Sequence, residues 1–336
     1  MKILITGNLG YIGPVLVEHL ANKQKDWELI GFDIGYFAHV TTTNDPLSDI
    51  KLQKQIYKDV RNITSHDLKG IDSVVYLAAI SNDPMGNQYE KATFEINQIA
   101  AINCAKLSKA AGVKSFVYAS SCSVYGTAEE GFKTEQSEVN PLTAYAKSKI
   151  NSEIELNKIA DDLFKVTCLR FATACGFSPR LRLDLVLNDF VASALVNKKI
   201  EILSDGSPWR PLIHVKDMSK AIEWAIERDT KNSRNFIALN VGSNQWNYQI
   251  KDLANAVLKV LPGVVLKINE TAQPDKRSYR VDFSLYESLN PTHNNFVDIN
   301  EAVNDILSGL NSIKFSDHDF RNGKLIRLNV LNENAV

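Results

Sequence analysis

Three glycines near the N-terminus place the strongest limit on how this chain folds. The apolar run Lys2–Thr6 leads into Gly7, Gly10 and Gly13, spaced GxxGxxG, and a helix-period segment begins at Tyr11. Glycines at this spacing permit a tight turn whose backbone N–H groups can approach a phosphate at the positive end of a helix. A strand, a glycine turn and a helix in this order predict the first unit of a dinucleotide-binding sheet.

Asp33 indicates which dinucleotide such a turn would bind. It ends the β-rich run Glu28–Asp33, and no Arg or Lys follows in Ile34–Val40. A carboxylate at this place accepts hydrogen bonds from a ribose 2′-hydroxyl and repels a 2′-phosphate, so we expect NAD rather than NADP. The predicted cofactor contacts are Gly7, Gly10, Tyr11, Ile12, Gly13, Asp33, Asp59, Val60, Leu77, Ala78, Ala79, Asn97, Tyr145 and Lys149.

The first half of the chain alternates strand and helix patterns. The candidate strands are Lys2–Thr6, Glu28–Asp33, Gln55–Asp59, Ser73–Ala78, Ser115–Ala119 and Lys165–Leu169. Helix-period segments at Tyr11–Lys23, Lys91–Ala111 and Tyr145–Asp162 lie between several of them. Nearly continuous apolar strands joined by helices predict an α/β fold with a doubly wound, Rossmann-type parallel sheet.

The pattern changes after Phe171. Further helices are expected at Leu183–Asn197, Val215–Arg228, Tyr248–Leu261 and Ile299–Leu310, and a further strand at Phe236–Val241. We predict an NAD-binding domain over residues 1–175, to which 236–247 returns, and a smaller mixed α/β substrate domain over 176–235 and 248–320. Residues 321–336 form a tail whose role stays open. No Pro- or Ser-rich linker separates the two parts, which predicts a shared interface.

Composition argues against several other classes of function. The 38 basic and 39 acidic side chains give a net charge of -1, which does not suit a general nucleic-acid binder. No apolar run reaches the roughly 18 to 20 residues that cross a bilayer, and the N-terminus does not read as a signal peptide. Cys104, Cys122, Cys168 and Cys175 have no CxxC spacing, so we expect buried thiols, no metal site and a cytoplasmic location.

Tyr145 and Lys149 are the predicted centre of the chemistry. They lie four residues apart on one face of a helix, and the fifth strand before them ends in a serine-rich segment containing Ser121. A free phenol has a pKa of about 10, so Tyr145 needs a neighbouring ammonium and a positive nicotinamide to act as a base. Tyr145 would then remove a proton from a hydroxyl while hydride leaves the same carbon, and Ser121 would hydrogen-bond the oxygen.

Together these motifs resemble the extended short-chain dehydrogenase/reductases that act on nucleotide-diphosphate sugars. The matching segments stand in family order: Thr6–Gly13, Asp33, Ser120–Gly126, Tyr145–Lys149 and Arg210–Met218. The resemblance implies a nucleotide-sugar substrate, and a homodimer formed by the helices at 91–111 and 145–162. It also implies that Asn97 orders the active site beside the cofactor.

The resemblance further implies a set of substrate contacts. Asn188 should meet the diphosphate, and Arg210 and Arg277 should neutralise its charge. Ser81 and Asn82 should contact the sugar. Ser121, Cys122 and Ser123 complete the expected substrate-binding residues. Arg180, Arg182 and Arg280 are interpreted equally well as substrate contacts or as members of surface ion pairs. His214 is expected to be a buried, hydrogen-bonded core residue.

Departures from subgroup patterns narrow the expected reaction. Cys122 and Ser123 stand where the family's 4,6-dehydratases carry an Asp-Glu pair, so dehydration is disfavoured. Ser123 also replaces the Cys of the epimerase-reductases, and Phe177–Arg182 contains no His, so isomerisation at C3 and C5 is not expected. Oxidation at C4 remains as the expected reaction. It would be carried out either by a 4-epimerase or by a 4-dehydrogenase similar to GDP-heptose-modifying members of the family. We favour the epimerase. A non-catalytic NAD sensor and a dehydrogenase of an apolar substrate are the rival classes.

Overall fold

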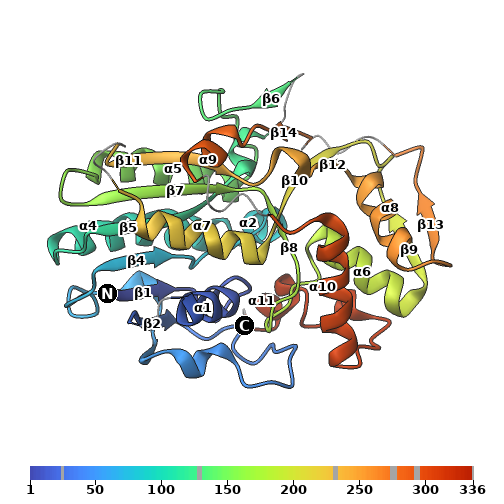
Figure 1. Cartoon of the computed structure of the whole chain (residues 1–336), viewed down its shortest axis with the longest axis horizontal. Helices are drawn as coiled ribbons and strands as arrows, with labels where there is room; N and C mark the ends of the chain where they lie inside the picture. The colour runs from blue at the N-terminus through green and yellow to red at the C-terminus, as the bar shows by residue number, and fades with distance from the viewer. Residues whose placement is uncertain (24–25, 127–130, 230–233, 273–277, 291–295, 335–336) are drawn as a thin grey trace.

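The computed structural model describes residues 1–336 apart from 24–25, 127–130, 230–233, 273–277, 291–295 and 335–336. Figure 1 shows a layered part that holds the main sheet and, beside it, a smaller part rich in helices from the second half of the chain. Arg277 falls outside the described residues, so its predicted role in binding substrate stays a prediction.

Seven parallel strands form the main sheet, in the order β11-β7-β5-β4-β1-β2-β3. They are β1 (Lys2–Thr6), β2 (Glu28–Asp33), β3 (Lys54–Tyr57), β4 (Ser73–Tyr76), β5 (Ser115–Ser121), β7 (Lys165–Phe171) and β11 (Phe236–Val241). The strand order reverses direction between β1 and β4, and ligands of such sheets bind outside the carboxyl ends of strands at this point. The predicted doubly wound α/β fold is confirmed.

The third strand is shorter than predicted. It ends at Tyr57, and Asp59 instead caps the short helix η2 (Val60–Asn62), accepting a hydrogen bond of 2.8 Å from the Arg61 backbone N–H. The polar cap competes with the strand ladder for this backbone and ends the strand early.

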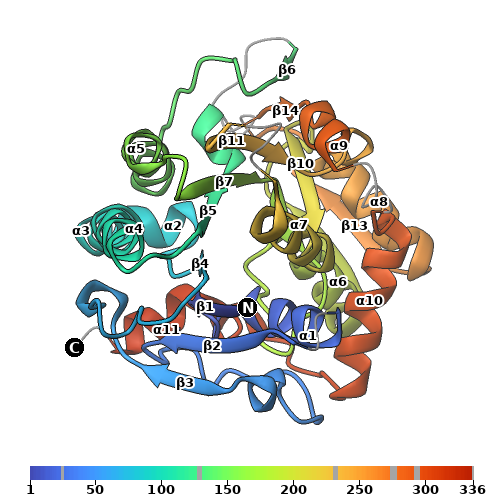
Figure 2. The same ribbon diagram turned by 60° about the vertical axis from the view of Figure 1, so that its left-hand side comes forward.

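Helices cover both faces of the sheet, as Figure 2 shows. They include α1 (Gly13–Lys23), α4 (Ala101–Ala110), α5 (Ala144–Ile159) and α7 (Val215–Glu227). On one face Leu16 and Leu20 of α1 pack into a core with Ile3 and Ile5 of β1. The other face buries the apolar sides of α4 and α5. The helix predicted at Lys91–Ala111 is divided into α3 (Glu90–Thr93), a π-helical segment η3 (Phe94–Ala100) and α4.

The smaller part contains three small sheets, with strand orders β12-β10-β8, β13-β9 and β14-β6. Its strands are β6 (Phe132–Lys133), β8 (Thr173–Cys175), β9 (Lys199–Ile202), β10 (Trp209–His214), β12 (Asn247–Gln249), β13 (Val265–Ile268) and β14 (Arg280–Val281). Its helices are α6 (Val186–Asn197), α8 (Ile250–Val260) and α10 (Ile299–Ser312), whereas α9 (Ser284–Leu289) packs against β11 of the main sheet. Leu187, Leu253 and Ile306 meet in a separate core. The domain boundaries themselves remain a prediction.

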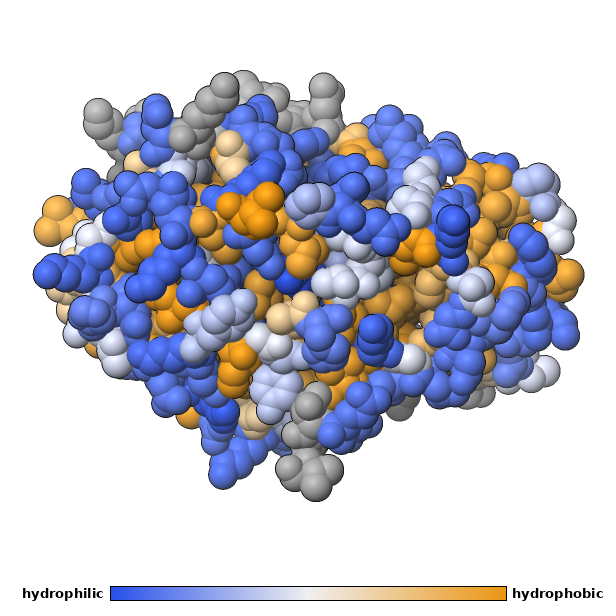
Figure 3. All heavy atoms as spheres, turned by 90° about the horizontal axis from the view of Figure 1, so that it is seen from below, coloured by the Kyte–Doolittle hydropathy of each residue, from blue (hydrophilic) through white to orange (hydrophobic). Residues whose placement is uncertain are grey.

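Several expectations about single residues agree with the fold. All four cysteines are buried free thiols. His214 is fully buried, with Nε2 lying 3.1 Å from Asp305 and Nδ1 accepting from the Lys216 backbone N–H. None of the helices in the described ranges is long and apolar enough to cross a membrane. Figure 3 shows a face on which hydrophilic and hydrophobic side chains are interspersed.

Candidate active site

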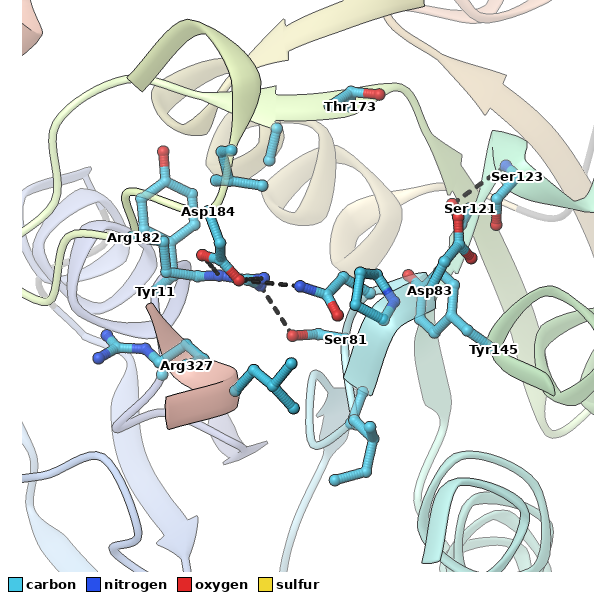
Figure 4. A pocket seen from close by; sticks show the side chains of 18 of the residues that line it. Tyr11, Ser81, Asp83, Ser121, Ser123, Tyr145, Thr173, Arg182, Asp184 and Arg327 are labelled. Carbon is cyan, nitrogen blue, oxygen red and sulfur yellow. Dashed lines mark hydrogen bonds and ion pairs between the residues drawn. The ribbon is translucent and has the colours of Figure 1, made fainter. Parts of the chain in front are cut away.

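A cavity of about 1530 Å³ connects the main sheet with the smaller part. Its wall includes Gly7 and Asp33 at one end of the predicted cofactor site, Tyr145 at the predicted catalytic site and Arg210 from the smaller part. Figure 4 shows the region between Tyr11 and Tyr145. A single space can therefore hold a dinucleotide and a second extended ligand together.

The glycine turn forms a cradle that larger side chains would fill. Gly7 has φ of +71°, and a Cβ on it would come within 2.6 Å of the Ala78 backbone nitrogen. A Cβ on Gly13 would collide with the Asn8 carbonyl, which explains why the loop enters α1 at a glycine. Gly10 donates its N–H to the Gly7 carbonyl over 3.1 Å and closes the turn. This cradle fits the diphosphate of NAD.

Asp33 joins the glycine turn to the end of β2. Its Oδ2 accepts a hydrogen bond of 3.0 Å from the Leu9 backbone N–H, and its Oδ1 accepts one of 2.7 Å from Gly35. Burial raises the pKa of Asp33 despite these hydrogen bonds. The carboxylate lies on the cavity wall, where it can still accept from ribose hydroxyls.

Most of the other predicted cofactor contacts also lie on the cavity wall. These residues are Gly10, Tyr11, Ile12, Asp59, Val60, Leu77, Ala78 and Ala79. The Tyr11 hydroxyl donates to the Gly176 carbonyl over 2.6 Å, which ties the glycine turn to the segment after β8. Gly13 is not part of the wall; the space it leaves is taken by the Asn8 carbonyl.

Asn97 acts behind the cavity wall rather than in it. It belongs to the π-helical segment η3 and is fully buried. Its side chain forms two hydrogen bonds of 2.9 Å with the Ile80 backbone: Oδ1 accepts from the N–H, and Nδ2 donates to the carbonyl. Its own carbonyl accepts from the hydroxyls of Tyr118 and Ser152. π-helical turns often occur at functional sites, and here the turn frees a carbonyl to bind side chains.

Tyr145, Lys149 and Ser121 converge as the sequence predicts. Thr143 caps α5, accepting a hydrogen bond of 3.1 Å from the Ala146 N–H, and this places Tyr145 in the first turn. Ser121 ends β5, and Figure 4 shows its side chain close to that of Tyr145. The Lys149 ammonium donates to the Ala119 carbonyl over 2.7 Å and lies 5.5 Å from the centre of the Tyr145 ring.

Burial acts in opposite directions on the two titratable groups. It raises the pKa of Tyr145 to about 12, while the neighbouring Ser121 hydroxyl acts to lower it. It lowers the pKa of Lys149 to about 7, against the attraction of the Glu153 carboxylate. Because each burial effect disfavours the charged form, the phenolate–ammonium pair depends on a further positive charge close by.

Five of the predicted substrate contacts line the same cavity: Ser81, Asn82, Ser121, Ser123 and Arg210. Arg210 from β10 reaches the wall and donates to the Trp209 carbonyl over 2.9 Å. Ser81 and Asn82 follow β4 and line the cavity opposite. Ser123 also lines it, and its buried hydroxyl has no hydrogen-bond partner among the residues that the structure describes.

Asn188 and Cys122 do not reach the cavity wall. The Asn188 amide is fully buried; its Oδ1 accepts from the Gly176 N–H over 3.0 Å and its Nδ2 donates to the Arg182 carbonyl over 2.9 Å. The Cys122 thiol donates to the Arg170 carbonyl over 3.0 Å on the side of the core. Both groups are occupied by the backbone, so in this structure each supports the wall without contacting its space.

Sequence reasoning assigned no individual role in the site to two charged residues of the cavity wall, Arg182 and Asp83. Arg182 is buried and paired with Asp184 at 2.7 Å, and it donates to the Ser81 hydroxyl over 2.8 Å. The surface ion pair considered for it is therefore a buried one. Asp83, beside Tyr145 in Figure 4, accepts from Thr143. The local sequence contains no signal that separates these groups from ordinary surface charges.

The other two arginines considered for surface ion pairs lie elsewhere. Arg180 is buried and pairs with Asp49 at 2.7 Å. Arg280 is placed between aromatic rings, with its guanidinium carbon 4.6 Å from the centre of the Phe132 ring and 5.2 Å from that of Trp209.

A comparison with known families agrees with the NAD site that the geometry of the cavity fits. The sequence model described as the NAD dependent epimerase/dehydratase family matches residues 3–242. The chain belongs to this family. It is therefore an NAD-dependent enzyme, and the match begins in β1 and extends through β11.

Individual relatives are distant. The chain is 30% identical over 234 residues to a protein of Bacillus subtilis named as an uncharacterized UDP-glucose epimerase, covering 66% of this chain and 71% of the relative. Among solved structures, UDP-glucuronic acid 4-epimerase from Bacillus cereus, in complex with UDP-glucuronic acid and NAD, superposes with a TM-score of 0.78 at 22% identity, covering 94% and 99%. TunA, an NAD-dependent NDP-hexosamine 5,6-dehydratase, gives a TM-score of 0.79 at 22% identity, covering 95% and 99%. At this identity the two structures establish the fold only.

Proposed function

We propose that the protein is a nucleotide-sugar 4-epimerase that oxidises and then reduces C4 of its substrate. One observation carries the proposal: Ser121 and Tyr145, with Lys149 one helical turn away, line a cavity that extends from the glycine turn to Arg210. A nucleotide diphosphate sugar is long and anionic, and both properties suit a cavity of this extent with an arginine at its far side.

The residues of the chain handle the proton. Bound NAD⁺ would supply the hydride acceptor for oxidation and the hydride donor for the return step. Tyr145, as phenolate, takes the proton of the C4 hydroxyl while the hydride leaves C4, so the C–O bond becomes a carbonyl. The Ser121 hydroxyl hydrogen-bonds this oxygen, and the Lys149 ammonium stabilises the phenolate. After the 4-keto sugar turns its other face, Tyr145 returns the proton to the oxygen.

The surroundings of Cys122 and Ser123 favour epimerisation over dehydration. Loss of water needs an acid and a base beyond Tyr145, and neither of these side chains provides one. The Cys122 thiol is directed to the Arg170 carbonyl, and burial raises its pKa. Ser123 offers a neutral hydroxyl to the cavity. This arrangement supports redox chemistry at a single carbon.

Turnover without added cofactor tests the proposal. The purified protein is offered GDP-, UDP-, dTDP- and CDP-sugars in turn, with absorbance followed at the wavelength of reduced nicotinamide and the sugars analysed by NMR. The epimerase converts one sugar to its C4 epimer with no lasting absorbance rise. A rise equal to the bound NAD⁺, with a released keto sugar, would instead establish the 4-dehydrogenase. Absence of both, in protein that holds NAD⁺, would contradict the substrate class.

We also propose a homodimer formed through η3, α4 and α5. Ile99 of η3 and Ile154 of α5 are 60% and 51% exposed, which is unusual for isoleucines on neighbouring helices and supports a covered face. Light scattering of the purified protein should give twice the chain mass. Ile154→Lys should shift it to the monomer mass, whereas Lys259→Glu, at an exposed position on α8 of the smaller part, should not. A cytoplasmic location remains a prediction.

A further inference from the structure

The C-terminal helix α11 (Arg327–Asn334) lies beside the N-terminal half of the molecule. Figures 1 and 2 both show it near β1 and α1, although the helix before it, α10, packs in the smaller part. The Asn332 side chain accepts hydrogen bonds of 2.7 Å from Gln88 and Tyr89. Ile326, Leu328 and Leu331 line the cavity. The tail thus closes one side of the space predicted to hold the dinucleotide.

Arg327, the first residue of α11, brings a buried charge to this wall. The side chain is 1% exposed, lines the cavity and lies over Phe37, with the guanidinium carbon 4.9 Å from the ring centre. Its Nη2 donates to the Arg180 carbonyl over 2.9 Å. Its Nη1 is buried and has no hydrogen-bond partner within the described part of the chain.

Three other buried arginines have carboxylate partners. Arg170 pairs with Glu153, Arg180 with Asp49 and Arg182 with Asp184. The described residues provide no such ion pair for Arg327. Burial, assisted by the nearby positive charge of Arg182, lowers the pKa of Arg327 to about 9. A guanidinium buried among other guanidinium groups, with an unused N–H, is suited to an anionic ligand.

The neighbours of Arg327 identify the end of the cavity at which it lies. Phe37 comes four residues after Asp33, and both line the cavity. The segment holding Arg180 is tied to the glycine turn, because Ser178 Oγ donates to the Tyr11 carbonyl over 2.6 Å. Arg180 also acts electrostatically on Asp33. This is the side of the predicted dinucleotide site, away from Tyr145.

We propose that Arg327 binds a phosphate of the dinucleotide, so that the C-terminal tail takes part in holding the cofactor. The two ligands of this cavity, NAD and the nucleotide sugar, share a diphosphate, and the position beside Phe37 and the glycine turn assigns Arg327 to NAD. The proposal depends on the NAD dependence of the family. It does not depend on the reaction proposed above, and binding measurements test it without turnover.

Arg327→Gln gives the sharpest test, because glutamine keeps a polar side chain of part of the length but removes the charge and the guanidinium fork. Calorimetry with nucleotide-free protein should show the Kd of NAD and of ADP-ribose raised at least about tenfold, and that of adenosine changed less than about twofold. Lys324→Gln is the matched control, since Lys324 is exposed on the same tail and does not line the cavity. It should leave all three affinities unchanged.

Three results would overturn the proposal. Equal losses of affinity for adenosine and ADP-ribose would show that Arg327 only maintains the shape of the site. An unchanged affinity for ADP-ribose would show that Arg327 does not contribute to binding the dinucleotide. A loss confined to UDP or GDP, titrated in the presence of saturating NAD, would assign it to the sugar nucleotide. If Arg327→Gln does not fold, Arg327→Lys is compared in the same way. The lysine variant keeps the charge but loses the fork, so its ADP-ribose affinity should fall more than its adenosine affinity.

Discussion

Glu153 forms a buried ion pair with Arg170 one helical turn beyond Lys149, with 2.6 Å between Glu153 Oε2 and Arg170 Nη2. Glu153 Oε1 also accepts a hydrogen bond of 2.5 Å from Ser120, the residue before Ser121. Its charge acts on Lys149 as well. The pair thus connects β5, α5 and β7 directly beneath the catalytic residues, and it holds Lys149 and Ser121 at a constant separation.

Glu153→Gln should lower the free energy of unfolding by about 3 kcal/mol, because it leaves the Arg170 charge buried with only a neutral partner. Chemical denaturation of the variant and the parent measures the difference. Glu155→Gln is the control, since its pair with Lys158 is exposed on the same helix and should contribute less than about 0.5 kcal/mol. Similar losses in the two variants would contradict a special role for the buried pair.

Tyr145→Phe should reduce kcat by about a hundred- to ten-thousandfold, because it removes the group that transfers the proton. The NAD content of the purified variant, measured after denaturation, should stay within about twofold of the parent, since the glycine turn and Asp33 are untouched. Tyr57→Phe, an exposed tyrosine at the end of β3, should leave kcat unchanged. A Tyr145→Phe enzyme with substantial kcat would require another base.

Stability should depend on pH through Lys149, whose pKa burial lowers to about 7. Above that pH the folded protein has released a proton that the unfolded chain keeps until about pH 10.4, so stability rises with pH across this range. Lys149→Met lacks the effect. In nucleotide-free protein, the free energy of unfolding of Lys149→Met minus that of the parent should therefore be greater at pH 6 than at pH 9, by about 2 kcal/mol. A difference in the free energy of unfolding that is equal at the two pH values would show that Lys149 keeps an ordinary pKa.

Gly7→Ala should abolish NAD binding, and Gly70→Ala should not. The two glycines have almost the same φ, +71° and +73°, so the backbone strain of alanine is similar, about 1 to 2 kcal/mol. Only at Gly7 would the new Cβ meet other atoms, at the Ala78 backbone, whereas the space beside Gly70 is open. Thermal denaturation and NAD titration of both variants separate strain from collision. Retention of NAD by Gly7→Ala would show that the turn can relax.

The order of elements along the first half of the chain could be predicted from local pattern. The strands from Lys2–Thr6 to Lys165–Leu169 and the glycine turn were recognisable because strand burial and backbone turns leave periodic signals within a few residues. The strands β9, β10 and β13 were missed, since they belong to small two- and three-stranded sheets outside the alternation of strands and helices that marks the first half of the chain. The end of β3 was misplaced by the capping preference of Asp59.

The sequence by itself determined the sheet, the cofactor turn, and the placing of Tyr145, Lys149 and Ser121 at one edge, because spacing within an element decides which side chains share a face. Only the tertiary structure decided that Asn188 and Cys122 point into the protein, that Arg182 reaches the Ser81 hydroxyl, and that Arg327 returns to the N-terminal half. These outcomes depend on packing between segments more than a hundred residues apart or on the exact rotation of one residue. The local sequence pattern does not indicate such packing or such a rotation, because the free energy that selects the final arrangement arises only when the remote surfaces come into contact.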